Sequence, residues 1–274
     1  MSKKTENPMA RMFVKRTNKG LKDIKNIKVS SNALLILGKD KNSLEQISKL
    51  ENRIENLDMI MPISKKCLNY YLRPKTRSNF ELGRATFKDK KIYSKTITND
   101  IARKYFRDAD KKDHLLFYGD NIYLKGNVSI KSKKMVEIFK WHIKEKFRSL
   151  KKSNAVEEIK RLYSYEKVNL LGLKQGFLNI RNKDFYYAIG DGNYLFGKVT
   201  DVNTILKTFE VMFVLFDEYN WGENDTYFFK FSSNPDKPYT TVIETAAFKR
   251  FEKEGLAKPF LTFFVDRATY SYFF

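Results

Sequence analysis

Large apolar residues are concentrated between positions 206 and 216, in a run that Lys207, Thr208 and Glu210 interrupt. Apolar side chains occupy both faces of an extended chain there: Phe209, Val211, Phe213 and Leu215 on one, and Met212, Val214 and Phe216 on the other. A strand with one face in water alternates apolar and polar side chains, whereas a strand covered on both faces is apolar throughout. The run therefore predicts a central strand with further structure packed against each face.

Other aromatic and β-branched stretches flank this strand, separated by clusters of Gly, Asn and Asp. They are residues 185–190, 194–197 and 227–231. This pattern indicates antiparallel strands joined by turns. A short helix over 244–254, ended by Gly255, and a last strand over 258–266 complete the pattern. Residues 184–274 are therefore expected to form an aromatic antiparallel β module with one short helix.

The residues before position 184 have mainly helical patterns. Asn42 followed by Glu45 is typical of a helix N-terminus, and the most regular pattern is an apolar residue at every fourth position from Met135 to Phe147. Helices are expected over 43–58, 99–111 and 132–151, and another beginning at Asn154 with Glu157; a loop with short strands is expected over 62–95, and a β-hairpin over 114–124.

The predicted fold class is therefore α+β. A disordered tail over 1–10 precedes a basic, mainly helical region over 11–183. That region is packed on, or joined to, the antiparallel sheet or sandwich-like module over 184–274. The boundary between the two regions rests on a change in charge and pattern.

Charge divides the chain in the same place. The whole sequence has 53 Lys and Arg against 32 Asp and Glu, a formal net charge of +21. Residues 184–274 contain 9 basic and 13 acidic residues, so residues 1–183 carry 44 basic and 19 acidic ones, a net charge of +25. Such a block attracts nucleic acid, anionic lipid head groups or an acidic protein. The alternative is that lysine simply fills solvated surface positions, since Arg is the residue that phosphate recognition favours.

The basic side of the 132–151 helix is the candidate polyanion-binding surface. Its residues are Lys133, Lys134, Lys140, Lys144, Arg148 and Lys151. A solvated helix face that binds nothing is the competing interpretation.

The single cysteine, Cys67, excludes an intramolecular disulfide, and no cysteine and histidine spacing indicates a metal site. The longest apolar run, residues 211–216, is far shorter than a membrane span. No signal-peptide pattern follows the first lysines. We therefore expect a cytoplasmic protein without cofactor, metal or transmembrane segment, or one exported by a route that needs no signal peptide.

No catalytic motif has recognisable spacing, so the sequence leaves open whether the protein is an enzyme. His114, at the start of a predicted strand, could act as a general base. Asp217 and Glu218, after the central strand, could act as acid and base or bind a cation. The alternatives are a solvated histidine and a turn in which the carboxylates bond the backbone.

Three short motifs carry a resemblance to a known family. They are Phe185-x-x-Ala188-Ile189-Gly190, Phe216-Asp217-x-Tyr219-Asn220-Trp221, and Phe248-x-Arg250-Phe251-x-x-x-Gly255-x-x-x-x-Phe260. Together they resemble an uncharacterised bacterial domain found among type VI secretion-associated and polymorphic-toxin-like proteins, over about residues 184–266. The family supplies no catalytic residues.

The resemblance implies a secreted interbacterial effector that acts on, or docks to, a polyanion such as nucleic acid. A secretion-apparatus protein and an immunity protein are the partners it implies. The alternative function is a non-enzymatic adaptor that binds nucleic acid or protein.

Overall fold

The fold is known from a computed structural model of the chain. The structure describes residues 14–17, 34–37, 42–55, 62–75, 113–118, 130–168, 188–189, 193–221, 226–231 and 239–273. The predicted tail over 1–10, the predicted helix over 99–111 and the second half of the predicted 114–124 hairpin lie outside these residues.

The chain forms two compact units, and each unit is built from two separate segments. The first unit comprises Met1–Arg77 and Asn220–Pro259, and the second comprises Ser78–Tyr219 and Phe260–Phe274. The boundary expected at residue 184 falls inside the second unit. Residues from both sides of that position therefore share one compact unit.

The first unit combines a four-stranded sheet with helices. Its strands, in spatial order, are β1 (Val14–Thr17), β7 (Thr226–Phe231), β8 (Tyr239–Glu244) and β2 (Leu34–Leu37). Its helices are α1 (Ser43–Glu55), α2 (Pro62–Leu72) and α8 (Thr245–Lys253). β7 is antiparallel to both β1 and β8, and β2 is parallel to β8.

Polar contacts tie the three helices of the first unit together. The Tyr71 hydroxyl of α2 donates to Glu252 Oε1 of α8 at 2.5 Å. The Arg250 guanidinium of α8 donates to Ser43 Oγ and to Gln46 Oε1 of α1, each at 3.0 Å. All these atoms are partly buried, so the bonds fix how the helices pack.

The predicted start of α1 is confirmed. Asn42 Oδ1 accepts the Glu45 backbone N–H at 3.2 Å, and the Asn42 side-chain amide reaches Glu45 Oε2 at 3.5 Å. This reciprocal contact satisfies a backbone donor that the first helical turn leaves without a partner.

The prediction of a loop from residue 62 onward was wrong where α2 forms. Ile63, Cys67, Tyr70 and Tyr71 are all buried and recur at helical spacing. Lys65 and Lys66 interrupt the apolar residues in the sequence. In a helix of only three turns, basic residues between the buried positions make the helical repeat of apolar residues hard to recognise.

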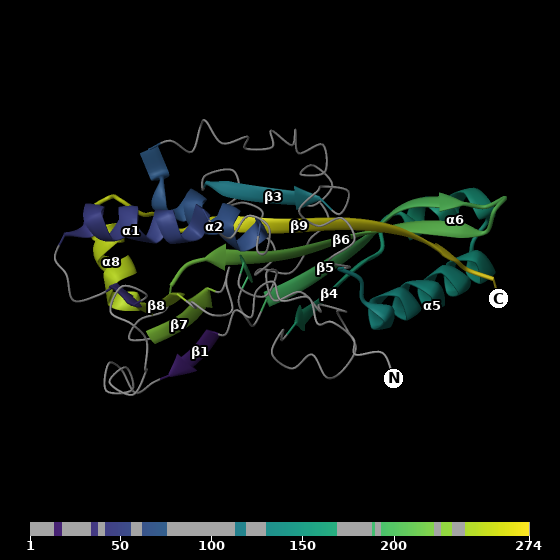
Figure 1. Cartoon of the computed structure of the whole chain (residues 1–274). Helices are drawn as coiled ribbons and strands as arrows, with labels where there is room; N and C mark the ends of the chain where they lie inside the picture. Colours follow the sequence, from purple (N-terminus) through teal and green to yellow (C-terminus); the bar gives the residue numbers. More distant parts are fainter. Residues whose placement is uncertain are drawn as a thin grey trace, which may run out of the picture. The chain divides into compact units, whose positions relative to one another are not determined.

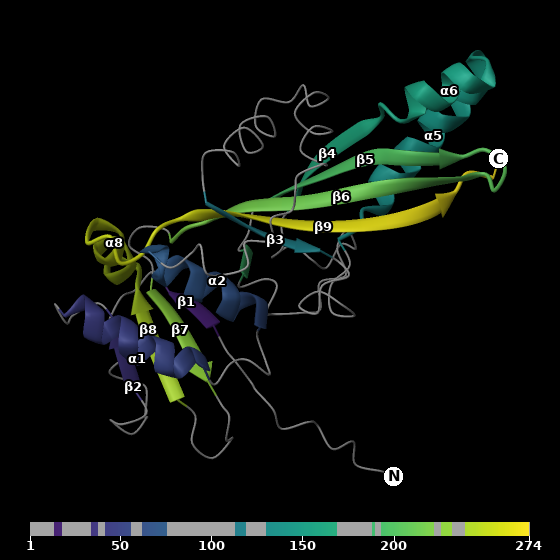
Figure 2. The ribbon, with the colours of Figure 1, turned by 90° about the horizontal axis from the view of Figure 1, so that it is seen from above.

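The second unit is built on a five-stranded sheet, which can be followed in Figures 1 and 2. Its strands, in spatial order, are β3 (His114–Tyr118), β9 (Phe260–Ser271), β6 (Thr208–Tyr219), β5 (Asn193–Asn203) and β4 (Tyr163–Val168). β4, β5, β6 and β9 are antiparallel in turn, and β3 is parallel to β9. The long strands β5, β6 and β9 run side by side in both views.

β6 is the central strand that the sequence predicted. Every residue from Phe209 to Phe216 except Glu210 is buried, so both faces of the strand are covered. Glu210 accepts bonds from Thr200 Oγ1 at 2.5 Å and from Arg267 Nη1 at 3.2 Å. The one carboxylate in the run is therefore paired on both neighbouring strands.

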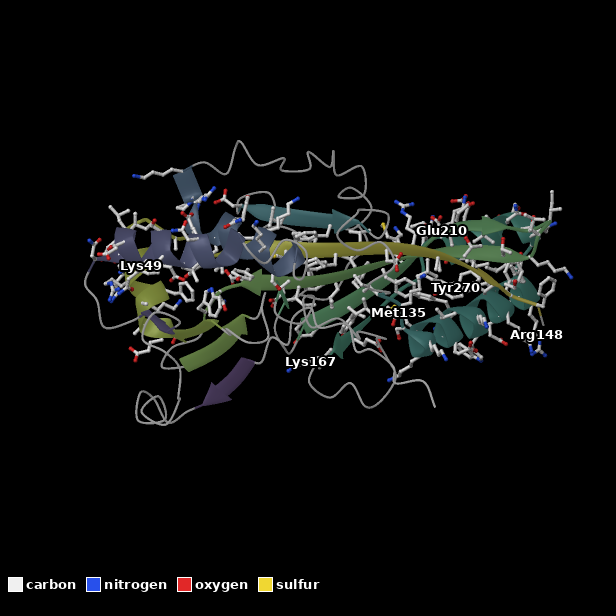
Figure 3. The ribbon with its side chains drawn as sticks, viewed as in Figure 1. Lys49, Met135, Arg148, Lys167, Glu210 and Tyr270 are labelled. Atoms are coloured by element: carbon white, nitrogen blue, oxygen red, sulfur yellow. The ribbon has the colours of Figure 1, made fainter. Side chains whose placement is uncertain are left out.

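α5 (Lys133–Ser149) packs against one face of this sheet, through Met135, Phe139 and Ile143. In Figure 3, Met135 and Tyr270 lie between α5 and the strands. Gly197 of β5 makes this packing close, because a Cβ built there would overlap Met135 Sδ and lie 3.5 Å from Phe139 Cε2. The missing side chain leaves the space that the methionine fills.

The α+β class is confirmed, but its two predicted parts are interleaved. β1 and β2 complete the sheet of the first unit, and β3 and β4 complete the sheet of the second, although all four precede residue 184. The predicted helix over 244–254 and its glycine are also confirmed, since α8 is followed by Gly255 with φ of 71°.

Candidate nucleic-acid interface

α5 lies within the predicted range 132–151, beginning one residue later and ending two residues earlier. Ser132 Oγ accepts the Met135 backbone N–H at 3.1 Å and caps the first turn. The Leu150 N–H donates to Lys146 O at 3.0 Å and closes the last turn. Lys146 and Arg148 in that turn place positive charge at the negative end of the helix dipole.

The following helix, α6 (Lys152–Ile159), starts two residues earlier than expected. The predicted start at Asn154 is therefore wrong, and Lys151 occupies the position before the first helical residue. Only Leu150 and Lys151 separate α5 from α6, so the chain turns back at once. Lys146 Nζ and Glu158 Oε2 are then 3.5 Å apart and join the two helices.

The outer side of α5 presents cations around an exposed tryptophan. Trp141 has 60% of its surface exposed. Lys134 and Arg148 are exposed seven residues before and after it, which is about two helical turns in each direction. Lys133 and Lys144 are exposed on the same side. Because α5 buries its opposite side in the sheet, these side chains are held on a rigid support.

Some cations of α5 and α6 form ion pairs with carboxylates, and others do not. Lys140 pairs with Glu137 at 3.0 Å, and both Lys146 and Arg161 pair with Glu158, at 3.5 and 3.0 Å. No carboxylate partner exists within the described residues for four further cations: Lys133, Lys134, Arg148 and Lys151. We call Lys133, Lys134, Trp141, Lys144, Arg148 and Lys151 the cationic face.

Five of the six lysines and arginines expected from the sequence thus belong to the cationic face. Lys140 is the exception, because it is half-buried and paired with Glu137. Trp141 was missed. Its spacing of seven residues from Lys134 and from Arg148 was the signal that could have found it.

The sheet register places the three candidate catalytic residues in one corner of the second unit. Leu261 of β9 pairs with His114 on one side and with Glu218 on the other. His114 and Glu218 are therefore two strands apart, about 10 Å between Cα atoms at the usual strand spacing. Asp217 pairs with the next residue, Thr262, whose hydroxyl donates to the Asp217 carbonyl oxygen at 3.2 Å.

Asp217 and Glu218 do not form a carboxylate pair, because consecutive strand residues point to opposite faces. The Asp217 carboxyl is almost wholly surrounded by protein atoms, although the residue keeps some accessible surface. Burial raises the pKa of Asp217 well above its usual value, and the Glu218 charge adds to the rise, while a backbone hydrogen bond opposes it. The arrangement therefore favours a neutral, structural carboxyl group.

Two other kinds of site find no support in the described ranges. No group of three His, Cys, Asp or Glu side chains in those ranges could hold a metal ion. None of the helices that the structure describes has the length and apolar character required to cross a bilayer.

Comparison of the chain with protein-family models, curated proteins and solved structures found no match. Of the motifs that carry the resemblance, Phe248 and Phe251 are buried core residues, and Gly255 has a positive φ. These positions serve packing and a helix end. What the fold and the site define is an α+β protein with an exposed cationic face on a sheet-supported helix.

Proposed function

We propose that the protein binds single-stranded nucleic acid through the cationic face. The observation that carries the proposal is the arrangement of Lys134, Trp141 and Arg148 along one side of α5, with both cations lacking a carboxylate partner among the described residues. Nucleic-acid binding is common to the two functions that the sequence suggests, the effector and the adaptor.

The chemistry of the face fits a phosphate backbone with accessible bases. Lysine and arginine neutralise phosphates and release counterions, which gives affinity without sequence preference. An exposed aromatic ring between them offers a surface on which a base can stack. Bases in a duplex are already stacked on each other, so the tryptophan favours a single strand.

The dimensions agree with several nucleotides. From Lys133 to Arg148 the helix is about 22 Å long at about 1.5 Å of rise per residue. Residues 131–161 contain eleven basic and four acidic residues, and two of the acidic residues, Glu137 and Glu158, already pair with cations. The remaining positive charge lies along α5, where a single strand of nucleic acid could follow the helix axis.

The test is fluorescence anisotropy of a labelled single-stranded oligonucleotide titrated with the full chain. The variant K133Q/K134Q/K151Q should bind at least tenfold more weakly and lower the salt slope by about 0.7 for each lost phosphate contact. A matched control is K75Q/K253Q/K258Q, which removes three exposed lysines of the first unit and the same charge. Equal losses in both variants would mean that net charge, and not the cationic face, governs binding.

The effector hypothesis remains a proposal that rests on the resemblance alone. It is tested by inducing the chain in a bacterial cytoplasm and, with a signal sequence, in the periplasm, while growth and DNA integrity are followed. Growth arrest that the K133Q/K134Q/K151Q variant relieves supports an effector acting on nucleic acid. Normal growth in both compartments, with soluble protein present, contradicts it and leaves the adaptor function.

A further inference from the structure

The turn between β5 and β6 exposes large apolar side chains. Ile205 is 88% exposed and Leu206 is 64% exposed. Phe273, two residues beyond β9, is 70% exposed. Single exposed apolar residues are ordinary on a protein surface, but a cluster of large ones marks an interaction site.

Contacts show that these three residues belong to one place. The Tyr272 N–H donates to Lys207 O at 2.9 Å, and the Tyr272 hydroxyl donates to Asn203 O at 3.2 Å. Lys207 Nζ lies 5.8 Å from the centre of the Phe273 ring. The C-terminal segment is therefore bound to the turn, and we call Ile205, Leu206, Lys207 and Phe273 the hairpin tip.

The turn holds its apolar side chains outward. Asn203 Oδ1 accepts the backbone N–H groups of Ile205 at 3.0 Å and Leu206 at 2.9 Å. Lys207 has φ of 50°, in the left-handed region that favours glycine. A turn fixed by these two bonds to Asn203 and by the two bonds from Tyr272 has little freedom to fold Ile205 and Leu206 back onto the protein.

Lys207 and the end of α5 place cations beside the hairpin tip. Phe147 stacks on Tyr272 with ring centroids 5.4 Å apart, which brings the last turn of α5 beside the tip. In Figure 3, Arg148 lies at this end of the unit, and Lys151 and Lys152 follow at the α5–α6 link. The nearby carboxylate of Asp201 is paired with Lys160 at 3.5 Å.

We propose that the hairpin tip inserts into the interface of an anionic lipid bilayer and holds the protein there as a peripheral protein. Aliphatic side chains with a phenyl ring partition into the boundary between head groups and acyl chains, and lysines beside them attract anionic head groups. Nucleic acid is the poorer occupant, because two of the three exposed apolar side chains, Ile205 and Leu206, have no aromatic face for a base. A second copy of the chain is the poorer occupant as well, because two molecules of formal charge +21 repel each other.

The test is co-sedimentation of the full chain with vesicles of phosphatidylcholine and phosphatidylserine, and with vesicles of phosphatidylcholine alone. The wild-type protein should pellet with the mixed vesicles and far less with the neutral ones. I205S/L206S should weaken binding to the mixed vesicles about tenfold or more, because it removes two inserted side chains. Circular dichroism checks that both proteins are folded.

Leu44→Ser is the matched control, because Leu44 of α1 is 66% exposed and lies outside the hairpin tip. It should leave vesicle binding unchanged. I205S/L206S should also leave oligonucleotide binding unchanged, which separates this proposal from the nucleic-acid one. Wild-type binding of I205S/L206S to mixed vesicles would overturn the proposal, as would a wild-type protein that ignores those vesicles. A wild-type dimer in light scattering that I205S/L206S converts to a monomer would overturn it in favour of self-association.

Discussion

Phe147 of α5 stacks on Tyr272, the residue that also bonds the β5–β6 turn, with ring centroids 5.4 Å apart at an interplanar angle of 24°. The end of the basic helix and the end of the longest strands are therefore packed together. Both proposed surfaces depend on this contact, because α5 carries the cationic face and Tyr272 anchors the hairpin tip.

Phe147→Ala should lower the free energy of unfolding by about 2 kcal/mol, less than a fully buried phenylalanine would because this side chain is only half-buried. Trp141→Ala, on the opposite side of α5, should change it by no more than about 0.5 kcal/mol. Denaturant titration followed by circular dichroism measures both. A large loss from Trp141→Ala would show that this tryptophan supports the fold and is not held free for a ligand.

Gly197→Ala should destabilise the second unit by about 1–3 kcal/mol, because the added Cβ overlaps Met135 Sδ. In a Met135→Ala background the same change should cost much less, since the space is already open. A double-mutant cycle by thermal or denaturant unfolding measures the coupling between the two residues. Additive effects would contradict the close packing of α5 on β5.

Lys207→Gly should stabilise the β5–β6 turn by about 1 kcal/mol, because glycine adopts a φ of 50° without the strain that lysine meets. The expected readout is a higher melting temperature together with slower hydrogen exchange at Leu206, whose N–H bonds Asn203 Oδ1. Thr204→Gly is the control at a neighbouring position without positive φ, and it should not stabilise the protein. A loss of stability in Lys207→Gly would contradict the conformation of the turn.

Asp217→Asn should make the stability of the protein less dependent on pH. Burial raises the pKa of Asp217, so the folded protein keeps this proton at pH values where the unfolded chain has lost it. The stability that the protonated group contributes is complete below the usual aspartate pKa of 3.8 and is lost as pH rises through the raised value. The asparagine variant keeps a neutral side chain throughout.

Free energies of unfolding measured at a series of pH values above 3.8 test this expectation. The wild-type protein should lose stability relative to Asp217→Asn as the pH increases. Parallel curves for the two proteins would place the Asp217 carboxyl in water.

The sequence predicted the elements whose periodic pattern is long. β6 shows seven apolar residues over its two faces, and α5 repeats an apolar residue every fourth position from Met135 to Phe147, so both were recognised. α2 was not recognised, because Lys65 and Lys66 break a short period.

Local sequence patterns did not predict which distant segments of the chain pair with each other. β2 and β8 pair in parallel across about 200 residues, and β3 and β9 across about 145, and no local signal encodes such contacts. The net charge does change at residue 184, but this change does not mark a boundary between units. β4, which precedes residue 184, pairs directly with β5, which follows it. Charged residues are placed at surface positions, whereas the boundaries of the compact units are set by contacts between buried residues.

The sequence predicted most of the cations of the candidate site but did not predict its aromatic residue. Lys133, Lys134 and Arg148 follow from their position opposite the apolar stripe. Trp141 was not among the predicted site residues. Only the orientation of α5 on the sheet shows that Trp141 faces outward and that Lys140 is committed to Glu137.

The most direct test of the central claim is the fluorescence of Trp141 in a Trp221→Phe background. Trp221 is the second of two tryptophans and packs on Phe248 with centroids 4.3 Å apart, so phenylalanine keeps an aromatic ring there and leaves Trp141 as the only reporter. Titration with a single-stranded oligonucleotide should quench the Trp141 emission, and added salt should restore it. An emission that stays unchanged while anisotropy reports binding would contradict the claim that the cationic face is the binding surface.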